Sequence, residues 1–114
     1  MIEIGSRVRK LPAPQSVVWD SFVQPEREGT RPWLSLAADE AAPRILGAEE
    51  PNRVVWSSLW PSRPNDEVHF ELAAIGSETS LKFTLLTPDE STTGHLRHRL
   101  NHLLFADLRY SYGQ

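Results

Sequence analysis

At 114 residues the chain is long enough for one domain, 1–114, built around one hydrophobic core. Its composition, 39% hydrophobic and 24% charged, is ordinary for a globular protein. The formal net charge of -3 argues against a nucleic-acid partner, because phosphate binding needs a clustered positive field. The absence of cysteine excludes disulfides, thiol nucleophiles and cysteine-based metal sites.

The sequence contains no apolar run near the ~20 residues that a helix needs to cross a bilayer. Its first residues also lack the basic segment and apolar stretch of a signal peptide. We therefore expect no membrane partner and a cytoplasmic location.

The first predicted elements are a strand and a short helix. Residues 2–11 alternate between apolar and polar, which predicts a half-buried strand with a possible bulge at Gly5. Prolines stop this strand, and residues 14–23 then predict a helix with Pro14 in its first turn. Pro25 ends the helix.

The middle of the chain is less regular. Residues 25–44 carry several prolines and charges, with one helical turn expected at 33–36. Residues 37–42 fit either a loop or a helix. A weak strand is predicted at 44–50, and the following Pro51-Asn52 is a turn signal.

Three stronger strands follow, at 53–60, 67–75 and 79–87, with a hairpin loop at 76–78. Alternation in the last two strands places one set of large apolar residues on the inner face: Val68, Phe70, Leu72, Leu81, Phe83 and Leu85. The pattern indicates an antiparallel sheet that is apolar on one side only. Residues 94–110 predict a long helix with a leucine stripe.

Three features together resemble the START-like or SRPBCC superfamily, whose members include polyketide cyclases and lipid-transfer proteins. The first is Pro14 followed by Val18-Trp19 on the first helix. The second is the run 48–56, which is similar to the E-x-P-x-R-L-V-W hairpin of the polyketide-cyclase-like branch. The third is the terminal leucine helix. The resemblance implies a helix-grip fold with an apolar pocket between sheet and helix.

The chain departs from the pattern of that superfamily at one place. Its members have a glycine-rich strand before the E-x-P hairpin, whereas residues 37–43 contain neither glycine nor a strand signal. The sequence therefore predicts a fold shortened by about one strand, with a pocket that is smaller or open at that edge.

Asp107 is the first candidate for chemistry. On an ideal helical wheel it falls among Leu100, Leu103 and Leu104, where burial would raise the pKa of its carboxyl. It could anchor a ligand or act as a general base. It could equally be a structural acid that is paired with an arginine or hydrogen-bonded to an aromatic side chain or a backbone amide.

A second candidate is the histidine set His95, His98 and His102, whose spacing would allow metal binding. The set lies opposite the leucine stripe, and no acid on the same arc would orient the rings. We therefore predict a solvated helix face with no metal. The sequence also lacks the glycine-rich motifs of nucleotide sites and the context of a serine nucleophile, so we predict no cofactor.

The sequence thus predicts an α+β helix-grip fold, a curved antiparallel sheet of about five or six strands around a long C-terminal helix. The favoured function is binding of an apolar or aromatic small molecule. The predicted ligand-binding residues are Trp33, Trp56, Phe70, Phe83, Leu100, Leu104 and Asp107.

Two alternatives remain open. One is a cyclase or hydratase that uses Asp107. The other is an interaction module with a filled pocket and an exposed apolar patch formed from Leu59, Leu86, Phe105 and Tyr112. Because an open sheet edge is a pairing liability, we also expect a homodimer through the 30–47 segment and the adjacent strand edge.

Overall fold

The computed structural model describes residues 2–24, 36–88, 99–109 and 112, and it contains five strands and two helices. The strands are β1 (Ile2–Leu11), β2 (Ile45–Glu49), β3 (Arg53–Ser57), β4 (Glu67–Ile75) and β5 (Glu78–Thr87). The first helix is α1 (Gln15–Val23), which begins after Pro14 as predicted. Residues 99–109 are helical and are called the terminal helix below, and Leu103–Leu108 within it form the π-helical segment η1.

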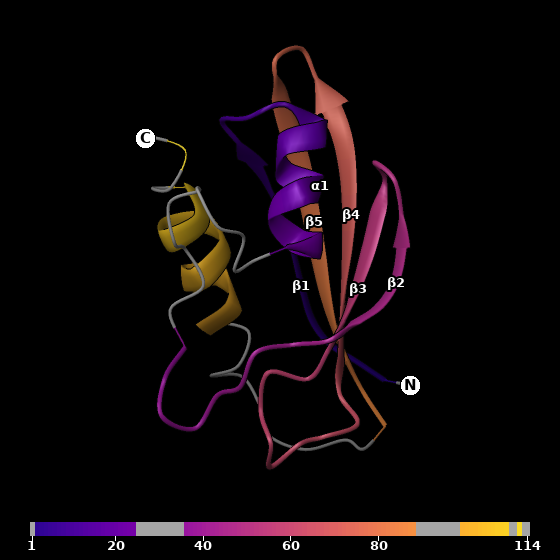
Figure 1. The fold of residues 1–114 in the computed structure, drawn as a ribbon, viewed down its shortest axis with the longest axis vertical. Coiled ribbons are helices and arrows are strands. Elements are labelled where there is room, and N and C mark those ends of the chain that lie inside the picture. The colour runs from indigo at the N-terminus through magenta and orange to yellow at the C-terminus, as the bar shows by residue number, and fades with distance from the viewer. Residues whose placement is uncertain (1, 25–35, 89–98, 110–111, 113–114) are drawn as a thin grey trace.

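The strands form one antiparallel sheet in the order β1-β5-β4-β3-β2, so that β1 and β2 lie at its edges (Figure 1). Extra residues shift the register between Glu3 and Gly5 in β1, which confirms the predicted bulge, and between Ile45 and Gly47 in β2. Gly76 begins the predicted β4–β5 hairpin loop with a positive φ of 60°, a conformation that glycine adopts without steric cost.

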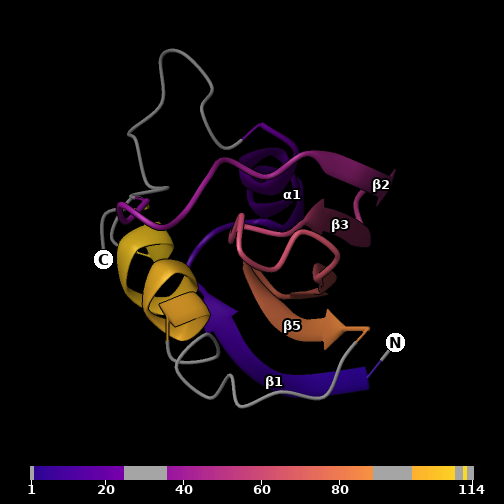
Figure 2. The same ribbon diagram turned by 90° about the horizontal axis from the view of Figure 1, so that it is seen from below.

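Both helices lie on the concave side of the curved sheet (Figure 2). The inward residues predicted for β4 and β5 are all buried there, and the pairing places Phe70 directly opposite Phe83. Leucines of the terminal helix and apolar residues of α1 belong to the same core cluster. The predicted α+β class and antiparallel sheet are therefore confirmed, and the arrangement fits a helix-grip fold with the core between the sheet and the two helices.

Strand β3 is shorter than predicted, because it ends at Ser57 and not at residue 60. The Ser58 hydroxyl accepts a hydrogen bond from the Trp60 amide and donates one to the Trp60 carbonyl, at 3.0 and 3.1 Å. Such local bonds compete with strand pairing. The chain turns here and buries Leu59 completely, so the prediction that Leu59 is exposed was wrong.

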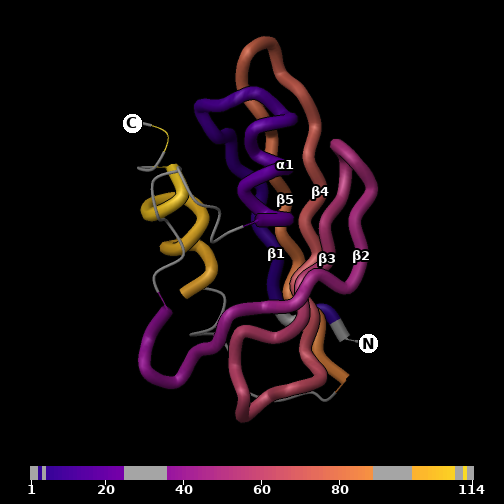
Figure 3. Tube along the Cα trace, viewed as in Figure 1, coloured from indigo at the N-terminus to yellow at the C-terminus, as the bar shows by residue number. Residues whose placement is uncertain are grey.

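The long C-terminal helix is not shown at its predicted length. Helical structure covers residues 99–109, while residues 94–98 and 110 lie outside the described part of the chain. Most of the helical turn predicted at 33–36 also lies outside it. Residues 37–42 form a loop, which passes the start of the terminal helix before it enters β2 (Figure 3).

Candidate functional site

Aromatic side chains fill the space between the sheet and α1. The rings of Phe22 and Phe70 stack with centroids 4.2 Å apart, and Trp56 meets Phe70 edge-on at 4.7 Å. The indole Nε1–H of Trp56 donates to the Phe22 carbonyl oxygen at 2.7 Å. Because that bond satisfies the one polar group of the indole, Trp56 is buried without an unpaired donor.

The terminal helix closes the other half of the interior. Leu100, Leu103, Leu104 and Leu108 are all fully buried, which confirms the leucine stripe as the core-facing side of the helix. Phe105 packs against the cluster, with its ring 6.0 Å from that of Phe83 on β5. Sheet and terminal helix therefore meet through large apolar side chains.

The structure brings together much of the predicted ligand-binding set. Trp56 and Phe70 are in contact on the α1 side, and Phe83 lies on the side of the terminal helix with Leu100 and Leu104. All five are fully buried in one apolar cluster and have no solvent-exposed surface. Trp33 lies outside the described residues.

Asp107, the polar member of that set, is not enclosed with the leucines. Its side chain is 28% exposed, and its Oδ1 lies 3.5 Å from Nε2 of His102, which is 62% exposed. The prediction that no acid accompanies the histidine arc was therefore wrong. The two residues are five apart, and η1 begins between them. In a π-helix the hydrogen bonds span five residues, so side chains five apart lie one turn from each other.

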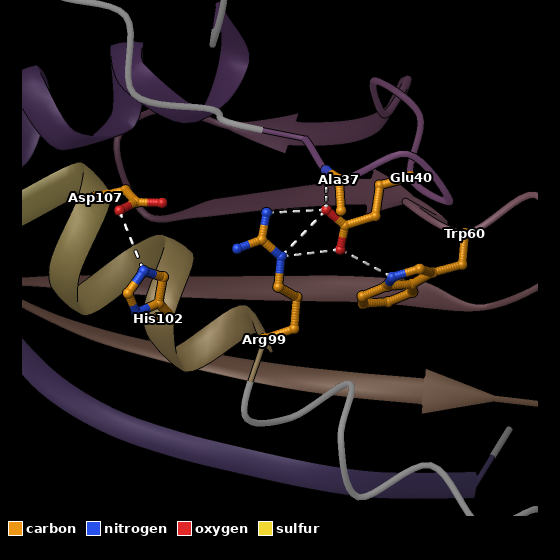
Figure 4. Close-up of polar contacts among 6 residues, drawn as sticks. All are labelled: Ala37, Glu40, Trp60, Arg99, His102 and Asp107. Carbon is orange, nitrogen blue, oxygen red and sulfur yellow. Dashed lines mark hydrogen bonds and ion pairs between the residues drawn. The ribbon is translucent and has the colours of Figure 1, made fainter.

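A buried acid that the sequence analysis missed lies at the rim of the interior. The side chain of Glu40, in the loop before β2, is 2% exposed, and both of its carboxylate oxygens bind Arg99 on the terminal helix (Figure 4). The Ala37 amide donates to Oε1 at 2.7 Å, and the Trp60 indole donates to Oε2 at 3.1 Å. The local sequence around Glu40 could not reveal this site, because Arg99 is 59 residues away.

The surroundings of Glu40 and Arg99 favour the charged forms of both side chains. Burial alone would raise the pKa of Glu40, but the hydrogen bonds from Arg99, Ala37 and Trp60 and the positive charge of Arg99 together lower it. The hydrogen bond to Glu40 raises the pKa of Arg99 despite its partial burial. Since both carboxylate oxygens are already bound, Glu40 acts as a tie between the loop and the terminal helix and not as a free base.

A second polar contact ties the far end of the terminal helix to α1. The Tyr112 hydroxyl donates to Ser21 Oγ at 2.8 Å. Burial of the phenol raises the pKa of Tyr112 to about 12, although the hydrogen bond to Ser21 opposes the shift. Tyr112 and Phe105 both pack against the core, so the prediction that they belong to an exposed apolar patch was wrong.

The two motifs behind the superfamily resemblance contact each other. Nε2 of Gln15, which follows Pro14, lies 3.1 Å from both the Pro51 carbonyl oxygen and the Asn52 Oδ1 in the turn between β2 and β3. Trp19 donates from its indole to the Arg53 carbonyl at 3.3 Å. In this chain the motifs therefore join α1 to the β2–β3 hairpin.

Metal binding finds no support in the residues that the structure describes. They contain no group of three or more histidine, cysteine, aspartate or glutamate side chains that could hold an ion. His95 and His98 lie outside these residues, so the metal-free reading of the histidine set stays a prediction.

No protein-family profile and no curated protein matches this chain. Solved structures do. CalU16 from Micromonospora echinospora superposes with a TM-score of 0.67 at 22% identity, over 88% of this chain and 68% of that one. The Aha1 dimer from Colwellia psychrerythraea superposes with a TM-score of 0.70 at 15% identity, over 93% of this chain and 92% of that one. DynU16, from the dynemicin biosynthetic locus, superposes with a TM-score of 0.57 at 17% identity, over 94% of this chain and 45% of that one.

The chain shares the fold of these proteins. At such low identities the likeness establishes the shared fold alone. Within the part of the chain that the structure describes, no helix is long and apolar enough to cross a membrane.

Proposed function

We propose that this chain is a shortened SRPBCC-type domain that binds an apolar or aromatic small molecule between the sheet and the terminal helix. The observation that carries the proposal is the convergence of Trp56, Phe70 and Phe83 from the sheet with Leu100 and Leu104 from the helix. Binding sites for such ligands are lined by apolar and aromatic side chains with a few polar groups. Trp33 is the other proposed lining residue, and Asp107, whose side chain is 28% exposed, is proposed only at the solvent-facing edge of the site.

The proposed shortening is supported by residues 36–44, the described part of the stretch between α1 and β2, which contain no strand. The prediction of a cytoplasmic location and of no nucleic-acid partner stands on composition alone.

Ligand entry requires a movement, because the five described apolar residues of the proposed site are fully buried in this structure. The terminal helix is the element whose displacement would open the space. Its first turn is held by the Glu40–Arg99 pair, and Tyr112 beyond its last turn is held by Ser21. We therefore propose that these two ties set how easily the site opens.

Three indole N–H groups at different places allow a direct test by NMR. Trp56 lies inside the proposed site, Trp60 at its rim and Trp19 on the α1–hairpin contact. Titration with naphthalene-based fluorophores should shift the Trp56 and Trp60 indole signals saturably and leave Trp19 nearly unmoved. Shifts confined to Trp19, or no saturable shift with any probe, would contradict the proposal.

A pair of variants sharpens this test. Leu104→Trp should fill the proposed space and weaken probe binding about tenfold or more, since one added large group removes the room for the ligand. Ile75→Trp places the same side chain at an exposed position, outside both the proposed site and β2, and should leave binding unchanged. A thermal melt of each variant checks that the fold is retained.

An interaction module with a filled interior is the second candidate, and the full burial of the predicted lining favours it. Under that alternative no probe binds at the interior, and the functional surface lies elsewhere. For a cyclase or hydratase, the contact between Asp107 and His102 supplies two titratable groups, of which His102 is largely exposed and Asp107 partly exposed.

A further inference from the structure

Strand β2 is an edge strand with an apolar surface. Among the described residues it pairs with β3 alone, so its other side presents unpaired backbone groups. Ile45 and Leu46 are 39% and 48% exposed, so two neighbouring large apolar side chains are open to solvent on this strand. Proline at 43 and 51 flanks the strand and limits any added strand to the short stretch between them.

The register shift in β2 places two charged residues on one face of the sheet. They are Arg44, just before the strand, and Glu49, its last residue. Ile45 is opposite the inward-facing Trp56, and Ala48 is opposite the inward-facing Val54. Arg44 and Glu49 flank these inward residues and therefore face outward, because side chains alternate along a strand. Without the extra residue, positions 44 and 49 would lie on opposite faces of the sheet.

Both charges are available for a partner. No described residue forms an ion pair with Arg44 or Glu49, and both side chains are exposed. The backbone of Arg44 is fixed, since its amide donates to Ser57 Oγ at 2.6 Å and its carbonyl accepts from the Ser57 amide at 2.8 Å. The edge thus has a positive end at Arg44 and a negative end at Glu49 and Glu50.

This arrangement is complementary to itself. We propose that β2 is the pairing edge for a second copy of this chain, which adds its own β2 antiparallel about a two-fold axis perpendicular to the sheet. Antiparallel pairing brings Arg44 of each copy to the end of the strand that carries Glu49 and Glu50 of the other. It also covers Ile45 and Leu46 and joins the two sheets into one.

The charge pattern yields a test that separates the interface from the fold. Arg44→Glu alone and the paired substitution Glu49→Arg with Glu50→Arg each put like charges together in the dimer. Light scattering should show a wild-type mass near twice the 12.9 kDa of one chain. For each variant by itself, the dissociation constant of the dimer should rise about tenfold or more.

Mixing the two variants should restore the dimer, because in the mixed pair the contacts between the two β2 strands are again between opposite charges. Glu78→Arg, an exposed charge reversal at the start of β5 and away from the β2 edge, is the control and should not affect the mass. Thermal melts confirm that each variant is folded. A monomeric wild type at micromolar concentration overturns the proposal, as does a dimer that neither variant weakens or that mixing fails to restore.

Discussion

Arg99 binds both carboxylate oxygens of Glu40 at 3.0–3.2 Å, and so joins the terminal helix to the loop before β2. The carboxylate is almost fully enclosed, while the guanidinium keeps some contact with solvent. An enclosed carboxylate that loses its cation is costly, because the remaining charge is desolvated without compensation. The cost of breaking this pair is therefore expected to come mainly from Glu40.

Replacing Arg99 with Met should lower the free energy of unfolding by about 2–3 kcal/mol, since it leaves Glu40 buried and unpaired. Adding Glu40→Gln to that variant should restore part of the loss, because the buried charge is then gone. Urea denaturation of the single and double variants measures both effects. Arg109→Met, at an exposed position on the same helix, is the matched control, and an equal loss there would refute the assignment.

The same pair predicts an acid-dependent stability. Because the folded-state pKa of Glu40 lies below its ordinary value of 4.5, the stabilisation is fully present above that value and is lost as the pH falls through the lowered one. In the Arg99→Met variant, the hydrogen bonds from Arg99 and the positive charge that lower the pKa of Glu40 are lost. The effect of burial is then opposed less, so the pKa of Glu40 should rise. The stability difference between wild type and variant should then be largest near neutral pH and shrink in acid. A difference independent of pH would contradict this account.

Leu104→Ala should destabilise the protein by about 2–5 kcal/mol, because it removes a fully buried side chain and leaves a cavity in the core. Ile75→Ala makes a comparable truncation at an exposed position outside β2 and should cost less than about 0.5 kcal/mol. Urea or thermal melts compare the two. Equal effects would mean that the leucine stripe is not the core face of the terminal helix.

Gln15→Ala should loosen the contact between α1 and the β2–β3 hairpin. Its amide lies within hydrogen-bonding distance of acceptors in the turn and of the Leu72 carbonyl on β4, so we expect a loss of about 1–3 kcal/mol. Gln24→Ala, just after the same helix, supplies an exposed control. Hydrogen exchange should also show faster opening at the Asn52 and Leu72 amides in the Gln15 variant alone, and unchanged exchange there would rule out the proposed coupling.

The histidines of the terminal region should not form a tight zinc site. His102 is largely exposed and contacts a single acid, Asp107, which falls short of the set of ligands that a zinc ion requires. Calorimetric titration with zinc in chelator-free buffer is the measurement. A stoichiometric site of submicromolar affinity that is lost in His98→Ala would disprove the prediction.

Local patterns predicted most of the strands correctly because alternation of side chains depends only on neighbours along the chain. The burial of Phe70 and Phe83 followed directly from it. The Glu40–Arg99 pair could not be predicted, since it depends on how distant segments meet. Asp107 was misplaced because the helical wheel assumed 3.6 residues per turn, whereas η1 is wider.

The π-helical turn also has a consequence for the end of the chain. A wider turn holds about one residue more than an α-helical turn, so it fits one extra residue into the same rotation around the helix axis. Deleting Ala106, an exposed residue within η1, would let the segment return to α-helical phase. The following residues would then keep roughly their present direction, because four residues of an α-helix cover about the same rotation as five residues of the wider turn. Leu108 should therefore stay in the core and Tyr112 should keep its bond to Ser21, so the wider turn accommodates one extra residue without changing how the last turn is anchored.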